Sequence, residues 1–154
     1  MKVCIISGRH PITEFDSATN HRLYADFHGY NYIHCNFPTK AFNPYFNKIY
    51  YILYYIDFFD YLIWIDVDAF FIDFSKDIMQ FAPKDNKFLS ACRSPDFKEL
   101  KTFLSSGQLI LKCNNIAKEF LKKVITIDLK IVKEWWFDEL GFFPMVIKML
   151  LFIF

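Results

Sequence analysis

The stretch Tyr61-Leu62-Ile63-Trp64-Ile65-Asp66-Val67-Asp68 decides the fold. A short run of consecutive apolar residues, rich in β-forming side chains, is typical of a strand that is buried on both faces. The run ends abruptly at two aspartates separated by one residue. In an extended backbone, Asp66 and Asp68 lie on the same side of the chain. The sequence therefore predicts a central strand that delivers two carboxylates to one end of a sheet.

Outside this stretch, strand patterns alternate with helix patterns. Strands are predicted at Val3–Ser7, Tyr30–Cys35, Lys87–Cys92 and Gln108–Lys112, and helices at Ser17–His28, Tyr45–Phe58 and Asn114–Ile125, with a turn into a short helix over Ile72–Phe81. Such alternation indicates βαβ units, so we expect an α/β fold with a mostly parallel sheet flanked by helices. Because no repeat or linker divides the chain, residues 1–154 are predicted to form a single domain.

Helix ends and helix faces can also be predicted. Ser17 and Asn114 are candidate N-caps, and Gly29 is a typical residue to end a helix. Apolar residues at helical spacing mark the faces of the first and last helices: Leu23 and Phe27, and Ile116, Phe120 and Val124.

Composition excludes one class of function. The chain carries 18 basic and 17 acidic residues, which leaves a net charge of +1 and no basic stripe. We therefore expect no nucleic-acid partner. The four cysteines, Cys4, Cys35, Cys92 and Cys113, lack metal-binding spacing and are predicted to be buried, reduced thiols.

The two ends of the chain bear on localisation. Val3–Ile6 is too short for the roughly 7–15 apolar residues of a signal peptide. The apolar segment Phe142–Phe154 is shorter than the roughly 20 residues that span a bilayer. We expect a cytoplasmic protein without a signal peptide or transmembrane anchor, in which Phe142–Phe154 packs on the domain or makes a peripheral membrane contact. The abrupt apolar end also suggests a domain truncated at its C-terminus.

Asp66 and Asp68 carry the chemistry. Ligands of open α/β sheets bind beyond the carboxyl ends of the strands, where these carboxylates are expected. Their mutual repulsion would be relieved by a cation, a shared proton or a basic partner. Carboxylate oxygens favour Mg²⁺, Ca²⁺ or Mn²⁺, which leave coordination positions for the oxygens of a diphosphate. A solvated turn with two exposed aspartates is the alternative.

Four blocks of the sequence then resemble a known family. They are Asn20-His21-Arg22-Leu23-Tyr24-Ala25 with His28-Gly29-Tyr30, Asn47-Lys48, the stretch Tyr61–Ala69, and Ser105-Ser106-Gly107-Gln108-Leu109-Ile110-Leu111-Lys112. In order and spacing these blocks resemble the galactosyl, mannosyl and xylosyl transferases of glycosyltransferase family 34. The resemblance covers roughly residues 1 to 140. It implies a GT-A fold, a UDP- or GDP-sugar donor, Mn²⁺ or Mg²⁺, a glycan acceptor and retention at the anomeric carbon.

The resemblance also implies roles for individual residues. Asp66 and Asp68 would hold the metal, with Asp66 also able to reach the donor. The donor-binding residues would be Ser7, Arg9, Lys48, Asp66, Ser106 and Gly107, and the catalytic candidates are Gln108, Asp138 and Glu139. Each has a structural alternative: a surface Arg9, a solvated helix face for Lys48, a bulge at Gly107, and a helix N-terminus at Asp138 and Glu139.

Three features depart from the family pattern. Ser105 stands where the family usually has Asn, and Glu139 stands in the place of a Gln. GT-A enzymes commonly add a late His to the metal site, whereas all four His here lie at positions 10, 21, 28 and 34. The last departure puts metal affinity and turnover in question.

The sequence thus predicts a metal-dependent enzyme that transfers a hexose or pentose to a glycan hydroxyl. One alternative is a degenerate or truncated remnant that binds donor without turnover. A less favoured alternative is a phosphatase of the haloacid dehalogenase type, whose DxD motif usually follows the first strand and is followed two residues later by Thr or Val rather than Phe70.

Overall fold

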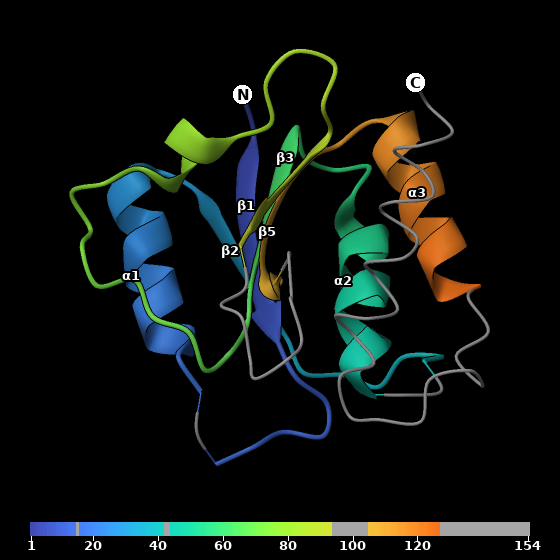
Figure 1. Ribbon diagram of the computed structural model, residues 1–154. Coiled ribbons are helices and arrows are strands. Elements are labelled where there is room, and N and C mark those ends of the chain that lie inside the picture. The colour runs from blue at the N-terminus through green and yellow to red at the C-terminus, as the bar shows by residue number, and fades with distance from the viewer. Residues whose placement is uncertain (15, 42–43, 94–104, 127–154) are drawn as a thin grey trace, which may run out of the picture.

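The structure, a computed structural model, describes residues 1–14, 16–41, 44–93 and 105–126 (Figure 1). Within this part of the chain, five strands form one sheet in the order β2-β1-β3-β5-β4. The strands are β1 Val3–Gly8, β2 Asn31–Cys35, β3 Tyr61–Ile65, β4 Leu89–Cys92 and β5 Ser105–Lys112. The helices are α1 Ala18–His28, α2 Asn47–Tyr55 and α3 Asn115–Ile125, with short 3-10 turns η1 Pro44–Phe46 and η2 Ile78–Phe81.

The sheet is mixed but mostly parallel. Strands β1, β2 and β3 run in the same direction. Strand β5 runs antiparallel to β3, and β4 runs antiparallel to β5, so β4 has the direction of the first three strands. The predicted α/β fold is therefore confirmed, with β5 as the exception. An antiparallel neighbour needs no helical crossover, and no helix pattern separates Lys87–Cys92 from Gln108–Lys112.

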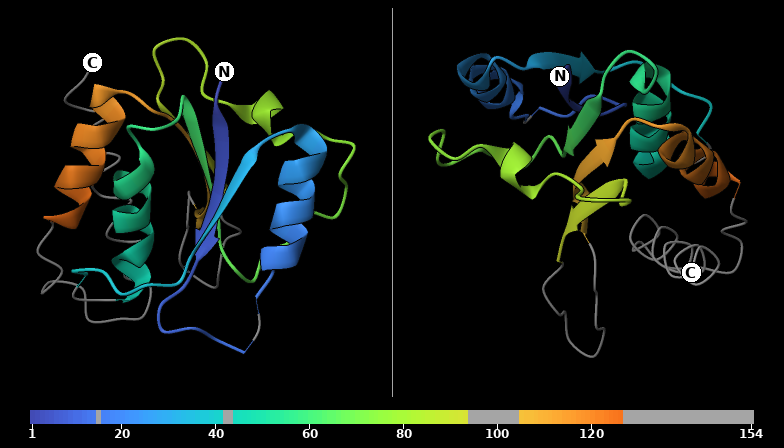
Figure 2. Two further views of the ribbon diagram at one scale, coloured as in Figure 1. Left: turned by 180° about the vertical axis from the view of Figure 1, so that it is seen from behind. Right: turned by 90° about the horizontal axis from the view of Figure 1, so that it is seen from above.

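Two apolar layers enclose the sheet. Figure 2 shows α1 and the η2 segment on one side of it, and α2 and α3 on the other. Because side chains alternate along a strand, Ile63 and Ile65 of β3 pack toward α1, whereas Leu62 and Trp64 pack toward α2 and α3. The central strand is thus buried on both faces, as its apolar run predicted.

The order of the strands creates a crevice at the carboxyl ends of β1 and β3. The chain passes from β1 through α1 to β2 on one side, and then returns through α2 to β3 on the other side of β1. At such a reversal the connections leave in opposite directions, so the strand ends between them stay open to a ligand. Gly8 and Ile65 end these two strands.

The helix termini lie at the predicted residues. Gly29 ends α1 in the left-handed conformation, with φ of 68°, and the Asn114 side chain accepts a hydrogen bond from the Ala117 N–H. Ser17 is the N-cap residue of α1 as predicted, but its side chain makes no capping bond and instead donates to the Val67 carbonyl oxygen at 2.7 Å.

The apolar spacing predicted the helices, but not always the buried face. Leu23 and Phe27 are exposed, because α1 turns His21, Tyr24 and Ala25 toward the sheet instead. Ile116 is exposed as well, whereas Phe120 and Val124 are buried as expected. All four cysteines are free, but Cys92 is exposed at the end of β4, and Cys113 is only partly buried. None of the helices described is long and apolar enough to cross a membrane.

Gly8 lies where the end of β1 closely approaches the backbone of β2. A Cβ added at Gly8 would lie 1.8 Å from the Cys35 carbonyl oxygen. Gly8→Ala should therefore lower the free energy of unfolding by about 3 kcal/mol or more, measured by urea denaturation, since two backbones would have to separate. Gly29→Ala is the matched control: no atom lies within 4 Å of its added Cβ, so only left-handed strain of about 1–2 kcal/mol applies. Equal losses would contradict this account.

Candidate active site

Asp66 lies at the centre of a polar cluster where β3, β5 and α2 meet. Its Oδ1 atom accepts a hydrogen bond of 2.6 Å from the Trp64 indole N–H. The ammonium of Lys48 lies 3.5 Å from the same oxygen. This arrangement follows from the alternation along β3, because Trp64 and Asp66 are two residues apart and share the face that α2 covers. Asp66 therefore has a fixed orientation.

Lys48 is buried although it carries a charge. Only 7% of the residue is exposed, and its Nζ donates to the Ser106 hydroxyl at 3.1 Å and approaches the Ser106 carbonyl oxygen at 3.4 Å. A buried ammonium is costly unless it is paired and hydrogen-bonded, and Asp66 and Ser106 provide both. The alternative of a solvated helix face for Lys48 is therefore wrong.

Gly107 is the close backbone contact of the cluster. It lies within β5, which begins at Ser105 and is longer than the predicted Gln108–Lys112 strand. Its carbonyl oxygen accepts from the Asp66 N–H at 2.9 Å, and a Cβ at this position would lie 2.9 Å from Asp66 Oδ2. A side chain at position 107 would therefore crowd this carboxylate. The bulge alternative also has support, because the pairing of β4 with β5 is irregular here: Ala91 pairs with Leu109, whereas Cys92 pairs with Ser105.

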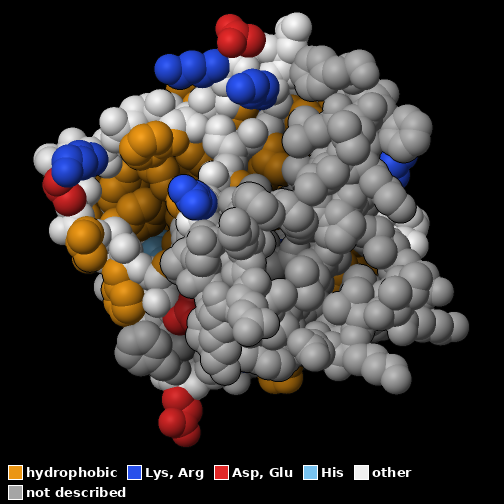
Figure 3. Space-filling model, in the orientation of Figure 1, with side chains coloured by type: hydrophobic (Ala, Val, Ile, Leu, Met, Phe, Trp, Pro, Cys, Tyr) orange, Lys and Arg blue, Asp and Glu red, His pale blue; other side chains and the backbone are white. Residues whose placement is uncertain are grey.

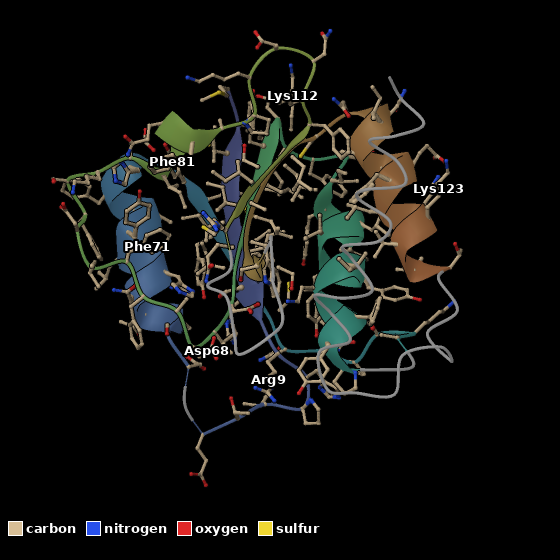
Figure 4. The ribbon with its side chains drawn as sticks, viewed as in Figure 1. Arg9, Asp68, Phe71, Phe81, Lys112 and Lys123 are labelled. Carbon is tan, nitrogen blue, oxygen red and sulfur yellow. The ribbon has the colours of Figure 1, made fainter. Side chains whose placement is uncertain are left out.

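A cavity of about 140 Å³ opens beside this cluster at the crevice between β1 and β3. Its lining includes Gly8, Arg9, Tyr45, Asn47, Lys48, Trp64, Asp66 and Asp68. Figure 4 shows Arg9 and Asp68 at the same edge of the sheet. Both are exposed, so the cavity joins one open cation and one open carboxylate to the buried Lys48–Asp66 pair. Ligand pockets usually measure roughly 300–1,000 Å³, so this one suits a part of a nucleotide sugar.

Asn47 fixes the loop that carries Arg9. Its side-chain amide donates to the His10 carbonyl oxygen at 2.9 Å, and its own oxygen accepts from the Thr39 hydroxyl. Two consecutive residues at the start of α2 therefore hold the two sides of the cavity. Asn47 binds the segment that follows β1, and Lys48 binds Asp66, which follows β3. Sequence reasoning missed Asn47 and Trp64 as site residues, although the position of Trp64 two residues before Asp66 was a usable signal.

Helix α1 holds the segment that follows Asp66. The Ser17 N–H and hydroxyl both donate to the Val67 carbonyl oxygen, at 2.8 and 2.7 Å. The Asn20 side chain exchanges two hydrogen bonds with the Phe71 backbone, and His21 Nε2 donates to the Ala69 carbonyl oxygen at 2.8 Å. These contacts lie on both sides of Asp68, so its backbone is held while its carboxylate stays exposed.

The remaining predicted residues lie elsewhere. Ser7 is buried on the α1 side of the sheet, bonded to the Tyr32 hydroxyl at 2.7 Å, and does not line the cavity at Arg9. Gln108 pairs with Ile65 and lines a second cavity on that side. Asp138 and Glu139, like Phe142–Phe154, lie outside the described residues. His28 contacts the Phe74 carbonyl oxygen, and His34 contacts the Tyr32 hydroxyl.

The metal prediction depends on two carboxylates. Within the described ranges, no group of three or more His, Cys, Asp or Glu side chains converges on one point. Magnesium-like ions in phosphate-handling sites are usually held by one or two carboxylates together with substrate oxygens and water. Asp68 is exposed, and one oxygen of Asp66 is already engaged by Trp64 and Lys48. The exposed Asp68 carboxylate and Asp66 Oδ2 are therefore the oxygens at this edge that would be available to such an ion.

Comparisons with known proteins agree with the fold. No protein-family model matches the chain, and no curated protein matches its sequence. Among solved structures, a glycosyltransferase involved in the glycosylation of the major capsid of PBCV-1 is similar, with a TM-score of 0.69 and 18% sequence identity. The match covers 100% of this chain and 76% of that chain. The protein therefore has the α/β fold of a glycosyltransferase.

The crowding at Gly107 generates a prediction about Asp66. In Gly107→Ala the new methyl group would lie 2.9 Å from Asp66 Oδ2 and would push the carboxylate away. This movement would disturb Asp66 Oδ1, which contacts the Trp64 indole and the Lys48 ammonium. We expect the Trp64 indole N–H resonance to shift in a proton–nitrogen NMR spectrum, and stability to fall by about 1 kcal/mol. Gly29→Ala, which meets no atom within 4 Å, should leave that resonance in place. An unchanged indole signal in Gly107→Ala would show that the crowding is relieved elsewhere.

His21 makes the contact between α1 and the segment after Asp68 sensitive to pH. It is fully buried, and its Nδ1 makes no hydrogen bond within the described part of the chain. Burial lowers the pKa of His21 from its ordinary 6.5, although the bond to the Ala69 carbonyl opposes this. The unfolded chain then binds the proton more readily, so the neutral imidazole contributes stability that is present above about pH 6.5 and is lost as pH falls toward the folded pKa.

The test compares the wild type with His21→Gln in urea denaturation at several pH values. Other titrating groups are common to both proteins, so the difference in free energy of unfolding isolates His21. We expect the advantage of the wild type to shrink as pH falls from about 7 to 5. A difference that stays constant over this interval would contradict the proposed role of the imidazole.

Proposed function

We propose that this chain is a glycosyltransferase that binds the diphosphate of a nucleotide sugar between β1 and β3. The observation that carries the proposal is the position of Asp66 and Asp68. They line, with Arg9 and Lys48, a cavity at the strand reversal of a glycosyltransferase-like fold. Ligands bind at this point in open α/β sheets, and the cavity offers both charged partners for phosphate and carboxylate ligands for a divalent cation.

The described residues would divide the work as follows. Arg9 is exposed at the rim and can pair with a phosphate oxygen. Lys48 is held in place by Asp66 and Ser106, so its positive charge is preorganised beside the cavity and needs no rearrangement when charge develops on the diphosphate. Asp68 and Asp66 would hold Mn²⁺ or Mg²⁺, which when bound supplies further positive charge next to the diphosphate.

The reaction is a group transfer. The oxygen of an acceptor hydroxyl forms a bond to the anomeric carbon, the bond from that carbon to the diphosphate oxygen breaks, and the hydroxyl proton leaves with the nucleoside diphosphate or to solvent. The resemblance to glycosyltransferase family 34 supports retention, a UDP- or GDP-sugar and a hexose or pentose as the transferred group. Asp138, Glu139 and Gln108 remain the catalytic candidates that the resemblance implies.

Neither alternative function gains a specific observation. A phosphatase of the haloacid dehalogenase type would place its aspartates after the first strand, whereas Asp66 and Asp68 follow β3. A remnant that binds donor without turnover would share the same cavity. Turnover therefore has to be measured apart from binding.

The deciding experiment is a thermal-shift titration with UDP- and GDP-sugars, each with and without Mn²⁺. A ligand of the folded state at a hundredfold excess over its Kd adds about 2.7 kcal/mol of stability. We expect a shift with one of the two nucleotide classes that grows in the presence of Mn²⁺. No shift with any nucleotide sugar would contradict a donor site in this chain.

Asp68→Asn is the sharper variant for this test, because Asp66 also neutralises a buried ammonium and its loss would disturb the fold. Asp68→Asn should keep the stability of the wild type and lose the Mn²⁺-dependent part of the shift. Asp26→Asn, an equally conservative change at an exposed position of α1, should keep it. Sugar transfer to a glycan then separates the enzyme from the remnant, and release of phosphate from an aryl phosphate would favour the phosphatase.

A further inference from the structure

A second, larger cavity lies on the α1 side of the sheet. It measures about 470 Å³, is open to solvent on one side, and is lined by residues of β3, β4 and β5 and of the segment from Ala69 to Phe81. Figure 3 shows hydrophobic side chains gathered in a hollow on this face, and Figure 4 places Phe71 and Phe81 on the same side of the sheet. The volume lies within the roughly 300–1,000 Å³ typical of sites for small ligands.

The lining of this cavity is apolar. Ile65 and Ile110 form its floor, and Phe71 and Phe81 are part of its wall. Ser90 and Gln108 contribute neutral polar side chains, and none of the lining residues carries a charge. A phosphate or a free sugar would lose its hydration here without ionic compensation, whereas an alkyl or aryl group would gain by leaving water.

The cavity shares no lining residue with the candidate active site, but residues adjacent in sequence line the two cavities. Ile65 immediately precedes Asp66, and Gln108 pairs with Ile65 in the register of β3 and β5. Gly107, next to Gln108, is in contact range of the Asp66 carboxylate. The same two strand ends thus separate a charged cavity on the α2 side from an apolar cavity on the α1 side, with the Gln108 amide at the boundary.

We propose that the apolar cavity binds the alkyl or aryl aglycone of an amphiphilic glycoside, and that this glycoside is the acceptor. The inference rests on the proposed glycosyl transfer and adds the chemical class of the acceptor. The sugar of the acceptor would lie at the boundary, within reach of the Gln108 amide, with a hydroxyl toward the Asp66 and Asp68 end of β3. The aglycone would fill the space between Ile110 and Phe81.

The test measures binding to the full 154-residue chain without donor, by isothermal titration calorimetry. The probes are methyl, n-hexyl and n-octyl β-D-glucopyranoside, each below its critical micelle concentration. The sugar is the same in all three, so any difference comes from the aglycone. Affinity should rise by roughly threefold to fourfold per methylene that enters the cavity, the factor equivalent to about 0.8 kcal/mol.

A cavity-filling variant localises this gain. Ser90 pairs with Ile110 and shares its face of the sheet, so the larger side chain of Ser90→Leu would occupy the cavity. We expect it to reduce the affinity for n-octyl glucoside at least tenfold and to leave the thermal shift with nucleotide sugar unchanged.

Ser90→Leu could lose binding because it misfolds. Two exposed phenylalanines provide an independent test of the cavity. Phe81 lines the cavity and is 64% exposed, whereas Phe58 follows α2, is 62% exposed and does not line it. Phe81→Ala should weaken n-octyl glucoside binding several-fold, and Phe58→Ala should not.

The outcomes separate this inference from the proposed function. Equal affinity for methyl and n-octyl glucoside, or equal losses in Phe81→Ala and Phe58→Ala, would overturn the aglycone site even if nucleotide sugars bind. A second outcome is chain-length-dependent binding that is lost in Ser90→Leu, in a protein that no nucleotide sugar stabilises. This result would leave an apolar ligand site but overturn the role of the cavity in binding an acceptor. Both the chain-length effect and the donor shift in one protein would support the proposal.

Discussion

The contact between the Lys48 ammonium and the Asp66 carboxylate is the constraint on which the site depends. Lys48 is almost fully buried, so its charge must be neutralised within the fold, and Asp66 lies 3.5 Å away to do so. Ser106 satisfies the ammonium from β5, and Trp64 orients the carboxylate from β3. One ion pair therefore joins α2 to the ends of two neighbouring strands. Gly107 has no side chain, which leaves room for the Asp66 carboxylate.

This arrangement gives the two aspartates different tasks. One oxygen of Asp66 contacts Trp64 and Lys48, so Asp66 supports the wall of the cavity and leaves its other oxygen for a ligand. Asp68 has an exposed carboxylate, while the backbone on either side of it is held by Ser17 and His21 of α1. A motif of two similar residues thus becomes one oriented, partly shielded group and one open group. In the proposed site, Asp68 would be the more accessible ligand of a cation, while Asp66 stays paired with the Lys48 ammonium.

The same strand ends also separate two environments. Toward α2 the cavity is charged and small, and toward α1 it is apolar and larger. The difference arises from the alternation of β3, which sends Trp64 and Asp66 to one face and Ile63 and Ile65 to the other. The proposed transfer from a charged donor to an amphiphilic acceptor would take place at this boundary, beside Gln108.

The sequence by itself determined the alternation of strands and helices, the burial of β3 on both faces, the caps at Gly29 and Asn114, and the placement of two carboxylates at a strand end. These follow from local periodicity and local backbone chemistry, which a linear chain displays directly. Three features emerged only from the folded chain: β5 inserts antiparallel between β3 and β4, the Ser17 side chain bonds to Val67, and Lys48 is buried against Asp66. Each of these depends on residues many positions apart, such as Lys48 and Ser106, whose approach is set by the packing of whole elements. A pattern read along one element does not contain that information, and for the same reason the apolar cavity beside Gln108 became visible only in the folded chain.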